Sequence, residues 1–305
     1  MALGSNHVTV TTAATFIPEI WSDEIVAAYK KSLVAANLFK KMSFAGKKGD
    51  TVHVPKPTRG VASVKAANTV VALQAATEGD VAILINKHYE YSRLIEDIVE
   101  TQALSSLRKF YTEDAGYALG KQVDTDLIQL GRGFNGGDGT ADYDKAFSGA
   151  DGTTAYVDGA SGSGALTDAA VRRTIQRLDD ADVPMEGRFI VVPPSARNTL
   201  MGIARYTEQA FVGEVGSGNT IRNGEIGNLY GIPVFVSSNA DTPTTTTSRI
   251  VLMGHKDAAV LAEQQSVRSQ TQYKQEYLGT LYTADTIYGV KEMRDDAAYA
   301  LAVPA

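Results

Sequence analysis

Two strand-forming stretches, separated by about 25 residues of weakly hydrophobic chain, place the strongest constraint on the fold of this sequence. Residues 51–54 (TVHV) alternate apolar and polar side chains, and a second strand pattern, DVAILINKHYEYS, spans residues 80–92. Residues 58–79 between them are mostly small or polar. A loop of this length is uncommon inside a compact domain unless it has a function. The pattern therefore predicts a long hairpin arm that extends from the main body.

The first side of this arm is basic, although the whole chain has a net charge of −6. The segment AGKKGDTVHVPKP (45–57) contains three lysines and two prolines, and proline confines a strand to the edge of a sheet. Residues 1–80 contain nine Lys and Arg against six Asp and Glu, whereas residues 81–160 contain seven against thirteen. These two segments can attract each other within one chain or between copies. The overall acidity argues against direct recognition of nucleic-acid bases or phosphates.

The composition is typical of a globular protein, with 44% hydrophobic and 21% charged residues in a chain of 305. No stretch approaches the ~20 apolar residues of a membrane helix, so we expect no membrane partner. The N-terminus lacks the basic and apolar regions of a signal peptide, so we expect none. The chain contains no cysteine, which excludes disulfides and fits synthesis and assembly inside a cell.

A long helical pattern follows the arm. Apolar side chains recur every three or four positions over residues 93–130, which predicts one helix of about 55 Å. Residues 131–164 contain ten glycines and little apolar content, which predicts a long flexible loop.

The remaining segments are predicted from shorter patterns. Residues 1–17 are polar and rich in Thr and Ala, which favours an extended arm, and a helical pattern follows from Ser22. From residue 166 onward helices and strands alternate, with RFIVVPP (188–194) as a buried strand. The tail, residues 280–305, alternates like an antiparallel strand pair.

No motif brings catalytic or metal-binding residues together. GRGFNG (131–136) matches the letters of the dinucleotide-binding fingerprint, but it follows a helix instead of a strand. The four histidines are scattered, and the carboxylate pairs that are adjacent in sequence diverge on a helix or strand. Asp138, Asp142 and Asp144 lack the closing Glu of a calcium loop, which leaves only weak adventitious binding open. We therefore expect no catalytic residue, no cofactor and no resident metal ion.

The order of these elements resembles that of the major capsid protein of tailed bacteriophages, which has the Hong Kong 97 fold. Four stretches carry the resemblance: KKGDTVHVPKP with VAILINKHYEYS for an extended loop, LIEDIVETQALSSLRKFYTEDAGYALGKQVDTDLI for a spine helix, VPPSARNTLM with GNLYGIPVFVSSN for an axial domain, and TADTIYGVKEMRDDAAYALAVP for the closing strands of a peripheral domain. The resemblance covers nearly the whole chain. It implies an α+β, Hong Kong 97-like capsid fold with an N-terminal arm, an extended β-hairpin loop, a long spine helix in a discontinuous peripheral domain, and an α/β axial domain.

The resemblance also implies domain boundaries. We expect an N-terminal arm and short helix in 1–36, the extended loop in 37–90, the spine helix and flexible loop of the peripheral domain in 91–165, the axial domain in 166–265, and the C-terminal strands of the peripheral domain in 266–305. The GSGNTIRNG loop of the axial domain would lie near the symmetry axes of the capsomers.

The implied function is that of a structural protein and not an enzyme. Copies of the chain would assemble through pentamers and hexamers, in the host cytoplasm, into the icosahedral capsid of a virion that encloses double-stranded DNA. The expected partners are other copies, a separate scaffolding protein, a portal, a decoration protein, and packaged DNA held by weak non-specific contacts. Two alternatives remain open: an encapsulin-type compartment shell protein, and a soluble α/β enzyme with an unrecognised site.

In this family the extended loop reaches across a neighbouring subunit, so its basic residues would face acidic residues of that neighbour. The residues that we expect at this subunit interface are Lys47, Lys48, Lys56 and Arg59 on the loop, with Glu96, Asp97 and Glu100 on the spine helix. The alternative is that the lysines only keep the arm soluble.

Overall fold

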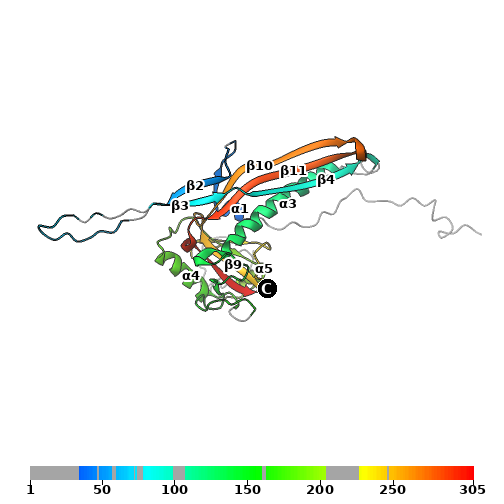
Figure 1. The fold of residues 1–305 in the computed structure, drawn as a ribbon. Helices are drawn as coiled ribbons and strands as arrows, with labels where there is room; N and C mark the ends of the chain where they lie inside the picture. The colour runs from blue at the N-terminus through cyan, green and yellow to red at the C-terminus, as the bar shows by residue number, and fades with distance from the viewer. Residues whose placement is uncertain are drawn as a thin grey trace, which may run out of the picture.

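The computed structural model describes residues 34–46, 48–56, 60–71, 73, 78–98, 107–159, 163–203, 227–245 and 247–305. In this part of the chain the molecule is elongated, with a thin arm at one end, a long sheet at the other, and a compact body below (Figure 1). The expected N-terminal arm, the helix from Ser22 and the GSGNTIRNG loop lie outside the described residues. No helix of the described part is long and apolar enough to span a membrane.

The long sheet has four strands in the order β1-β10-β11-β4. Their bounds are Lys40–Ser43 for β1, Ala259–Lys274 for β10, Gly279–Glu292 for β11 and Lys87–Glu96 for β4. Strand β1 runs parallel to β10, whereas β10, β11 and β4 are antiparallel neighbours. Strands β10 and β11 have 16 and 14 residues and exceed the usual strand length of about 3–10 residues, so the sheet reaches far beyond the body.

One face of this sheet packs against helix α3 (Leu107–Gln129), which runs along the strands in Figure 1. Ala115 and Leu119 of the helix are buried against Tyr282 and Ala284 of β11. Tyr282 and Ala284 are two residues apart, so they lie on the same face of the strand. The small alanines allow the helix and the sheet to approach closely.

The prediction of one helix over residues 93–130 was wrong at its start. Residues 93–96 are the end of β4, where Arg93 pairs with Tyr282 and Ile95 with Thr280 of β11. The period-two pattern of Tyr89, Tyr91 and Ile95 is satisfied by the sheet, and these side chains are shielded on the helix side. Residues 99–106 lie outside the described residues.

The body contains a six-stranded sheet in the order β5-β12-β9-β6-β8-β7. The strands are β5 (Phe147–Ser148), β6 (Arg188–Val192), β7 (Asn228–Leu229), β8 (Ile232–Val236), β9 (Ser248–His255) and β12 (Ala298–Pro304), with helices α4 (Asp168–Asp180) and α5 (Pro194–Met201). All five residues of β6 are buried, as expected for RFIVVPP. Helix α5 begins at Pro194, whose fixed φ suits the first helical turn.

The C-terminal strands do not pair with each other as predicted for residues 280–305. Strand β11 pairs with β10 and β4 in the long sheet, whereas β12 pairs with β9 and β5 in the body. The two C-terminal strands therefore belong to different sheets. Every residue of β12 except Pro304 is buried, which explains why it occupies the interior of the six-stranded sheet.

The prediction of a flexible loop over 131–164 was also wrong. Its described part contains short 3₁₀ turns, η2 (Leu130–Arg132) and η3 (Phe134–Gly136), and the strand β5. Tyr143 and Tyr156 are buried against the six-stranded sheet, and the Tyr143 hydroxyl donates to Asp241 Oδ2 at 2.7 Å. Glycines such as Gly136 and Gly152 adopt positive φ at turns. The glycines thus mark tight turns, and two aromatic side chains anchor the segment.

A buried carboxylate joins the two sheets at the end of α3. Asp124 Oδ1 accepts hydrogen bonds from the backbone amides of Val34 (2.9 Å) and Ala35 (2.7 Å) at the start of α1 (Ala35–Leu38). Asp124 Oδ2 accepts from Asn239 Nδ2 of the body at 2.9 Å. Next to this junction, the Phe39 ring packs edge-on against Phe189 of β6 at 5.1 Å. One hydrophobic core therefore runs from the long sheet into the body.

We expect Asp124→Ala to destabilise the subunit by about 2–4 kcal/mol, because three hydrogen-bond donors lose their acceptor and Asp124 is fully buried. Urea unfolding of the unassembled subunit measures this change. The exposed substitution Glu276→Ala is the matched control and should shift the free energy of unfolding by less than about 0.5 kcal/mol. Equal stability of the two variants would contradict the assigned role of Asp124.

Candidate functional site

The arm is a two-stranded hairpin, as the sequence predicted. Strand β2 (Thr51–Lys56) pairs antiparallel with β3 (Gly79–Leu84), from Thr51 opposite Leu84 to Lys56 opposite Gly79. His53 Nδ1 contacts Asp80 Oδ2 across the two strands. Because β2 has only β3 as a neighbour, Pro55 sits on a sheet edge, where a missing backbone N–H is tolerated.

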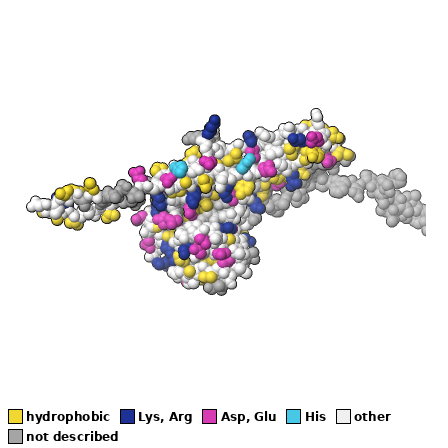
Figure 2. Space-filling model, viewed as in Figure 1, with side chains coloured by type: hydrophobic (Ala, Val, Ile, Leu, Met, Phe, Trp, Pro, Cys, Tyr) yellow, Lys and Arg dark blue, Asp and Glu magenta, His cyan; other side chains and the backbone are white. Residues whose placement is uncertain are grey.

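The part of the arm beyond the paired strands has almost no protein around it. Five large apolar side chains there are between 63% and 101% exposed: Val61, Val64, Val70, Val71 and Leu73. Figure 2 shows this arm as a thin projection with hydrophobic side chains along it. Single exposed apolar residues are common on protein surfaces, but a row of them on a projecting arm marks an interaction surface.

The base of the arm is fixed to the long sheet by a small hydrophobic cluster. Ile83 and Ile85 from the arm side are buried with Val260 and Ala262 of β10. Val52 is partly buried against the same cluster. A two-stranded hairpin is marginally stable alone, so this cluster holds the base in place while the tip remains exposed.

A network of charged and polar side chains lies on the face of the long sheet opposite α3. Asp285 of β11 accepts two hydrogen bonds from Arg268, at 3.1 Å and 2.9 Å, one from Gln265 Nε2 at 2.9 Å and one from His88 Nε2 at 3.3 Å. The pairing of β10 with β11 shifts register between Glu263 and Arg268. The network therefore connects β4, β11 and β10 at the irregular part of β10.

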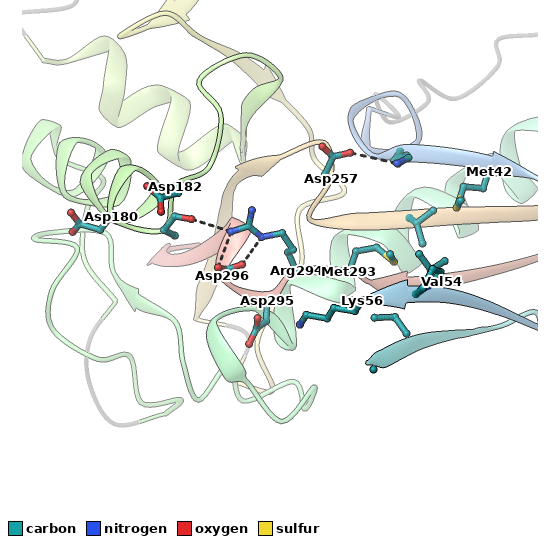
Figure 3. Close-up of a pocket in the computed structure, with 16 residues that line it drawn as sticks. Met42, Val54, Lys56, Asp180, Asp182, Asp257, Met293, Arg294, Asp295 and Asp296 are labelled. Carbon is teal, nitrogen blue, oxygen red and sulfur yellow. Dashed lines mark hydrogen bonds and ion pairs between the residues drawn. The ribbon is translucent and has the colours of Figure 1, made fainter. Parts of the chain in front are cut away.

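A cleft of about 1110 Å³ separates the arm base from the body (Figure 3). Its arm side is formed by Val54, Pro55, Lys56, Gly79 and Val81. Five aspartates line it: Asp180, Asp182, Asp257, Asp295 and Asp296. Three cations, Lys40, Lys56 and Arg294, also line it.

Only part of the cleft's negative charge is compensated nearby. Arg294 Nη2 donates to Asp296 Oδ2 at 2.8 Å, and this hydrogen bond lowers the pKa of Asp296 below its ordinary value. Lys40 Nζ lies 4.0 Å from Asp257 Oδ1. The other three lining aspartates, Asp180, Asp182 and Asp295, are all exposed. The cleft therefore has an excess of negative charge.

The structure changes the expected interface in several ways. Lys48 is exposed beside the arm, whereas Lys56 lies in the cleft near aspartates of its own chain. Glu96 is the last residue of β4, and Asp97 follows it in a helical turn that precedes α3. Asp97 Oδ2 accepts from the Tyr273 hydroxyl at 2.7 Å. Lys47, Arg59 and Glu100 lie outside the described residues.

Among the described residues, Lys56 and Glu96 are not brought together within one chain. Glu96 lies at the opposite end of the β3–β4 segment from Gly79, the register partner of Lys56 (Figure 1). That segment spans on the order of 50 Å at the rise of an extended strand. Contact between Lys56 and Glu96 would therefore require two copies. The aspartates of the cleft were missed, because three separate segments of the chain supply them.

The described residues contain no group of three or more His, Asp or Glu side chains that could hold a metal ion. In the segment with the calcium-like aspartates, Asp138 Oδ1 accepts from the backbone amide and hydroxyl of Thr140 at 2.8 Å and 2.7 Å. These hydrogen bonds lower the pKa of Asp138 below its ordinary value. Asp138 thus stabilises a local turn.

The Asp285 network predicts a pH dependence of stability. The hydrogen bond from Arg268 lowers the pKa of Asp285 below its ordinary value, with smaller contributions from His88 and Gln265. A carboxylate with a lowered pKa stabilises the fold above its unfolded-state pKa of about 3.9, and that stability is lost as the pH falls through the lowered pKa. We expect Arg268→Gln to weaken this loss as the pH falls below about 4.

Urea midpoints measured across this pH range test the prediction. Lys145→Gln is the control, because Lys145 forms an exposed pair with Asp144 that contributes little to stability. Identical acid profiles for Arg268→Gln and the unmodified chain would contradict the role of the network.

Comparisons with known proteins agree with the resemblance noted from the sequence. The chain matches the family model described as phage capsid protein over residues 37–294. No curated protein matches the sequence. Among solved structures, one from Mycobacterium phage Che8 superposes with a TM-score of 0.75 at 24% identity, over 94% of this chain and 97% of that chain.

Two other solved structures extend this likeness. The capsid of cyanophage P-SCSP1u gives a TM-score of 0.73 at 17% identity, over 99% of this chain and 96% of that chain. The capsid of a native GTA particle gives 0.62 at 11% identity, over 99% and 100%. At these identities the likeness establishes the fold, and the family model establishes the family. The chain therefore belongs to the phage capsid protein family, has a Hong Kong 97-like fold, and is a structural major capsid protein that forms the shell of a tailed-phage virion.

Proposed function

We propose that this capsid protein assembles through pentamers and hexamers into an icosahedral shell around double-stranded DNA, and that the arm joins neighbouring subunits. The observation that carries this proposal is the row of exposed apolar side chains on the arm. Full burial of each one contributes about 1.5–3 kcal/mol, so a neighbour that covers several of them gains substantial binding energy. Without such a neighbour these side chains stay in water.

The charge distribution supports contacts between copies. Lys47 and Lys48 are adjacent in the sequence just before the arm, and Lys48 is exposed. Glu96 and Asp97, at the far end of β4, are acidic groups that a neighbouring loop can meet. Each exposed ion pair contributes only about 0–1 kcal/mol, but every contact is repeated throughout a shell.

The remaining partners follow from the same proposal. Weak, sequence-independent contact with packaged DNA suits an acidic chain. A separate scaffolding protein, a portal and a decoration protein would complete the particle, and assembly would take place in the host cytoplasm.

Negative-stain microscopy of the purified chain, expressed alone and with a scaffolding protein, tests the proposal. We expect icosahedral shells or regular capsomers in at least one of the two preparations. DNA in particles from infected cells supports a phage head, whereas enclosed cargo enzymes would indicate an encapsulin-type compartment. Persistent monomers in both preparations would contradict the proposal.

The double variant Lys47→Glu/Lys48→Glu tests the charge contribution. We expect fewer assembled particles and a subunit that is still folded, because Lys48 is exposed and the reversed charges repel acidic groups of the neighbour. Particle yield by sedimentation and subunit folding by circular dichroism measure the two effects. Lys145→Glu, an exposed charge reversal outside the arm, is the control. A normal particle yield from the double variant would refute the pairing.

A further inference from the structure

We propose that the cleft at the base of the arm receives the arm tip of a second copy. This inference rests on the proposed function, because it names the surface through which the arm joins neighbouring subunits. The supporting observation is that two surfaces of the same chain, the cleft and the tip segment 60–73, both have apolar side chains and have opposite charges.

The tip segment is apolar and carries positive charge only. Residues 60–73 (GVASVKAANTVVAL) contain four valines, one leucine and Lys65, with no acidic residue. Lys65 and the large apolar side chains of the described tip are exposed. A suitable binding surface for this segment therefore combines an apolar floor with nearby carboxylates.

The cleft has both features. Its floor contains the partly exposed apolar side chains of Met42, Val54, Val81 and Met293. Its wall on the body side carries Asp180, Asp182 and Asp295, as Figure 3 shows for the labelled residues. The cleft volume of about 1110 Å³ is slightly larger than the ~300–1,000 Å³ typical of small-molecule pockets, so it has room for a chain segment.

The electrostatics of the body-side wall favour a cation. Asp180 is the last residue of α4, where the helix dipole adds partial negative charge. The five aspartates of the cleft exceed its three cations, and two of those cations lie beside Asp257 and Asp296. Lys65 of an incoming tip would reduce this excess.

The tip of the same chain cannot fill the cleft. Lys56 and Gly79 line the cleft and also form the last register pair of the hairpin, so the tip extends away from its own base (Figure 1). Folding the tip back would disrupt the β2–β3 pairing. The occupant is therefore a second copy, and the contact joins the tip of one chain to the base of the next.

Contacts between two different surfaces of the same chain are heterologous, and they close into rings when the rotation between copies permits. A ring of subunits in which each tip occupies the next cleft buries every exposed tip. An open chain of such contacts would leave one tip and one cleft without a partner.

Cysteine pairs test the contact directly, because the natural chain has no cysteine. Val64→Cys and Asp295→Cys place one thiol on the tip and one in the cleft, both at exposed positions. Under oxidation we expect assembled particles of the double variant to give a ladder of covalent multimers on denaturing gels. Val61→Cys and Val70→Cys, each with Asp295→Cys, cover neighbouring positions along the tip.

The control pair combines Val64→Cys with Val157→Cys, an exposed position of the body outside the cleft. This pair should give no ladder. If particles form but none of the three tip positions cross-links to Asp295→Cys, the cleft proposal is wrong while the proposed function stands. If no particles form from the unmodified chain, the proposed function itself fails.

A charge exchange provides an independent readout. Lys65→Glu and Asp295→Lys should each lower the particle yield, and the double variant should recover part of that loss because the attraction is restored in reverse. All substituted positions are exposed, so folding should be preserved in each variant. Equal losses in the single variants with no recovery in the double variant would overturn the pairing of Lys65 with the cleft.

Discussion

The structure depends on one constraint: the arm contains apolar side chains that its own chain does not bury. The small cluster around Ile83 and Ile85 holds the arm base on the long sheet. Beyond the paired strands, Val64 and Leu73 are almost fully exposed. Burial of apolar surface is the main favourable term in protein association. The exposed side chains of the arm therefore contribute favourable free energy only when another molecule covers them. The rest of the fold holds the arm in position for that contact.

Rigid attachment of the arm requires the long sheet and the body to behave as one unit. Asp124 provides part of this connection, because a single buried carboxylate binds the start of α1 and Asn239 of the body. Asp126 acts nearby, where it accepts from the Tyr288 hydroxyl at 2.7 Å and pairs with Lys87 at 2.9 Å. Both aspartates come from the last turns of α3, so this helix couples β4, β11 and the body.

Much of the fold could be predicted from local pattern, because period-two and helical spacing are properties of short segments. The hairpin and the buried strand at 188–192 were predicted correctly for this reason. The helix prediction failed at residues 93–96, where a sheet partner decides between strand and helix. The separation of β11 from β12 into two sheets also depends on long-range pairing, which local alternation does not encode.

The segment 131–164 and the cleft show a second limit of sequence pattern. Glycine content suggested flexibility, but the buried rings of Tyr143 and Tyr156 fix the segment. The expected acidic partners, Glu96, Asp97 and Glu100, were chosen from the acidic charge of their segment and its predicted spine helix, whereas the aspartates of the cleft come from three separate segments. The basic charge of the arm could be predicted from composition. The acidic cleft beside the arm could be identified only from the tertiary structure.

Hydrogen exchange of the arm amides at residues 60–71 tests the central claim most directly, with the unassembled subunit and the assembled particle compared under the same conditions. Exchange reports how often each amide is exposed to solvent, and these residues lie beyond the paired strands. The account predicts rapid exchange in the subunit and strong protection in the particle, because a neighbour covers the arm. Equally rapid exchange in both states would show that the arm stays exposed in the shell, and would contradict its role in joining subunits.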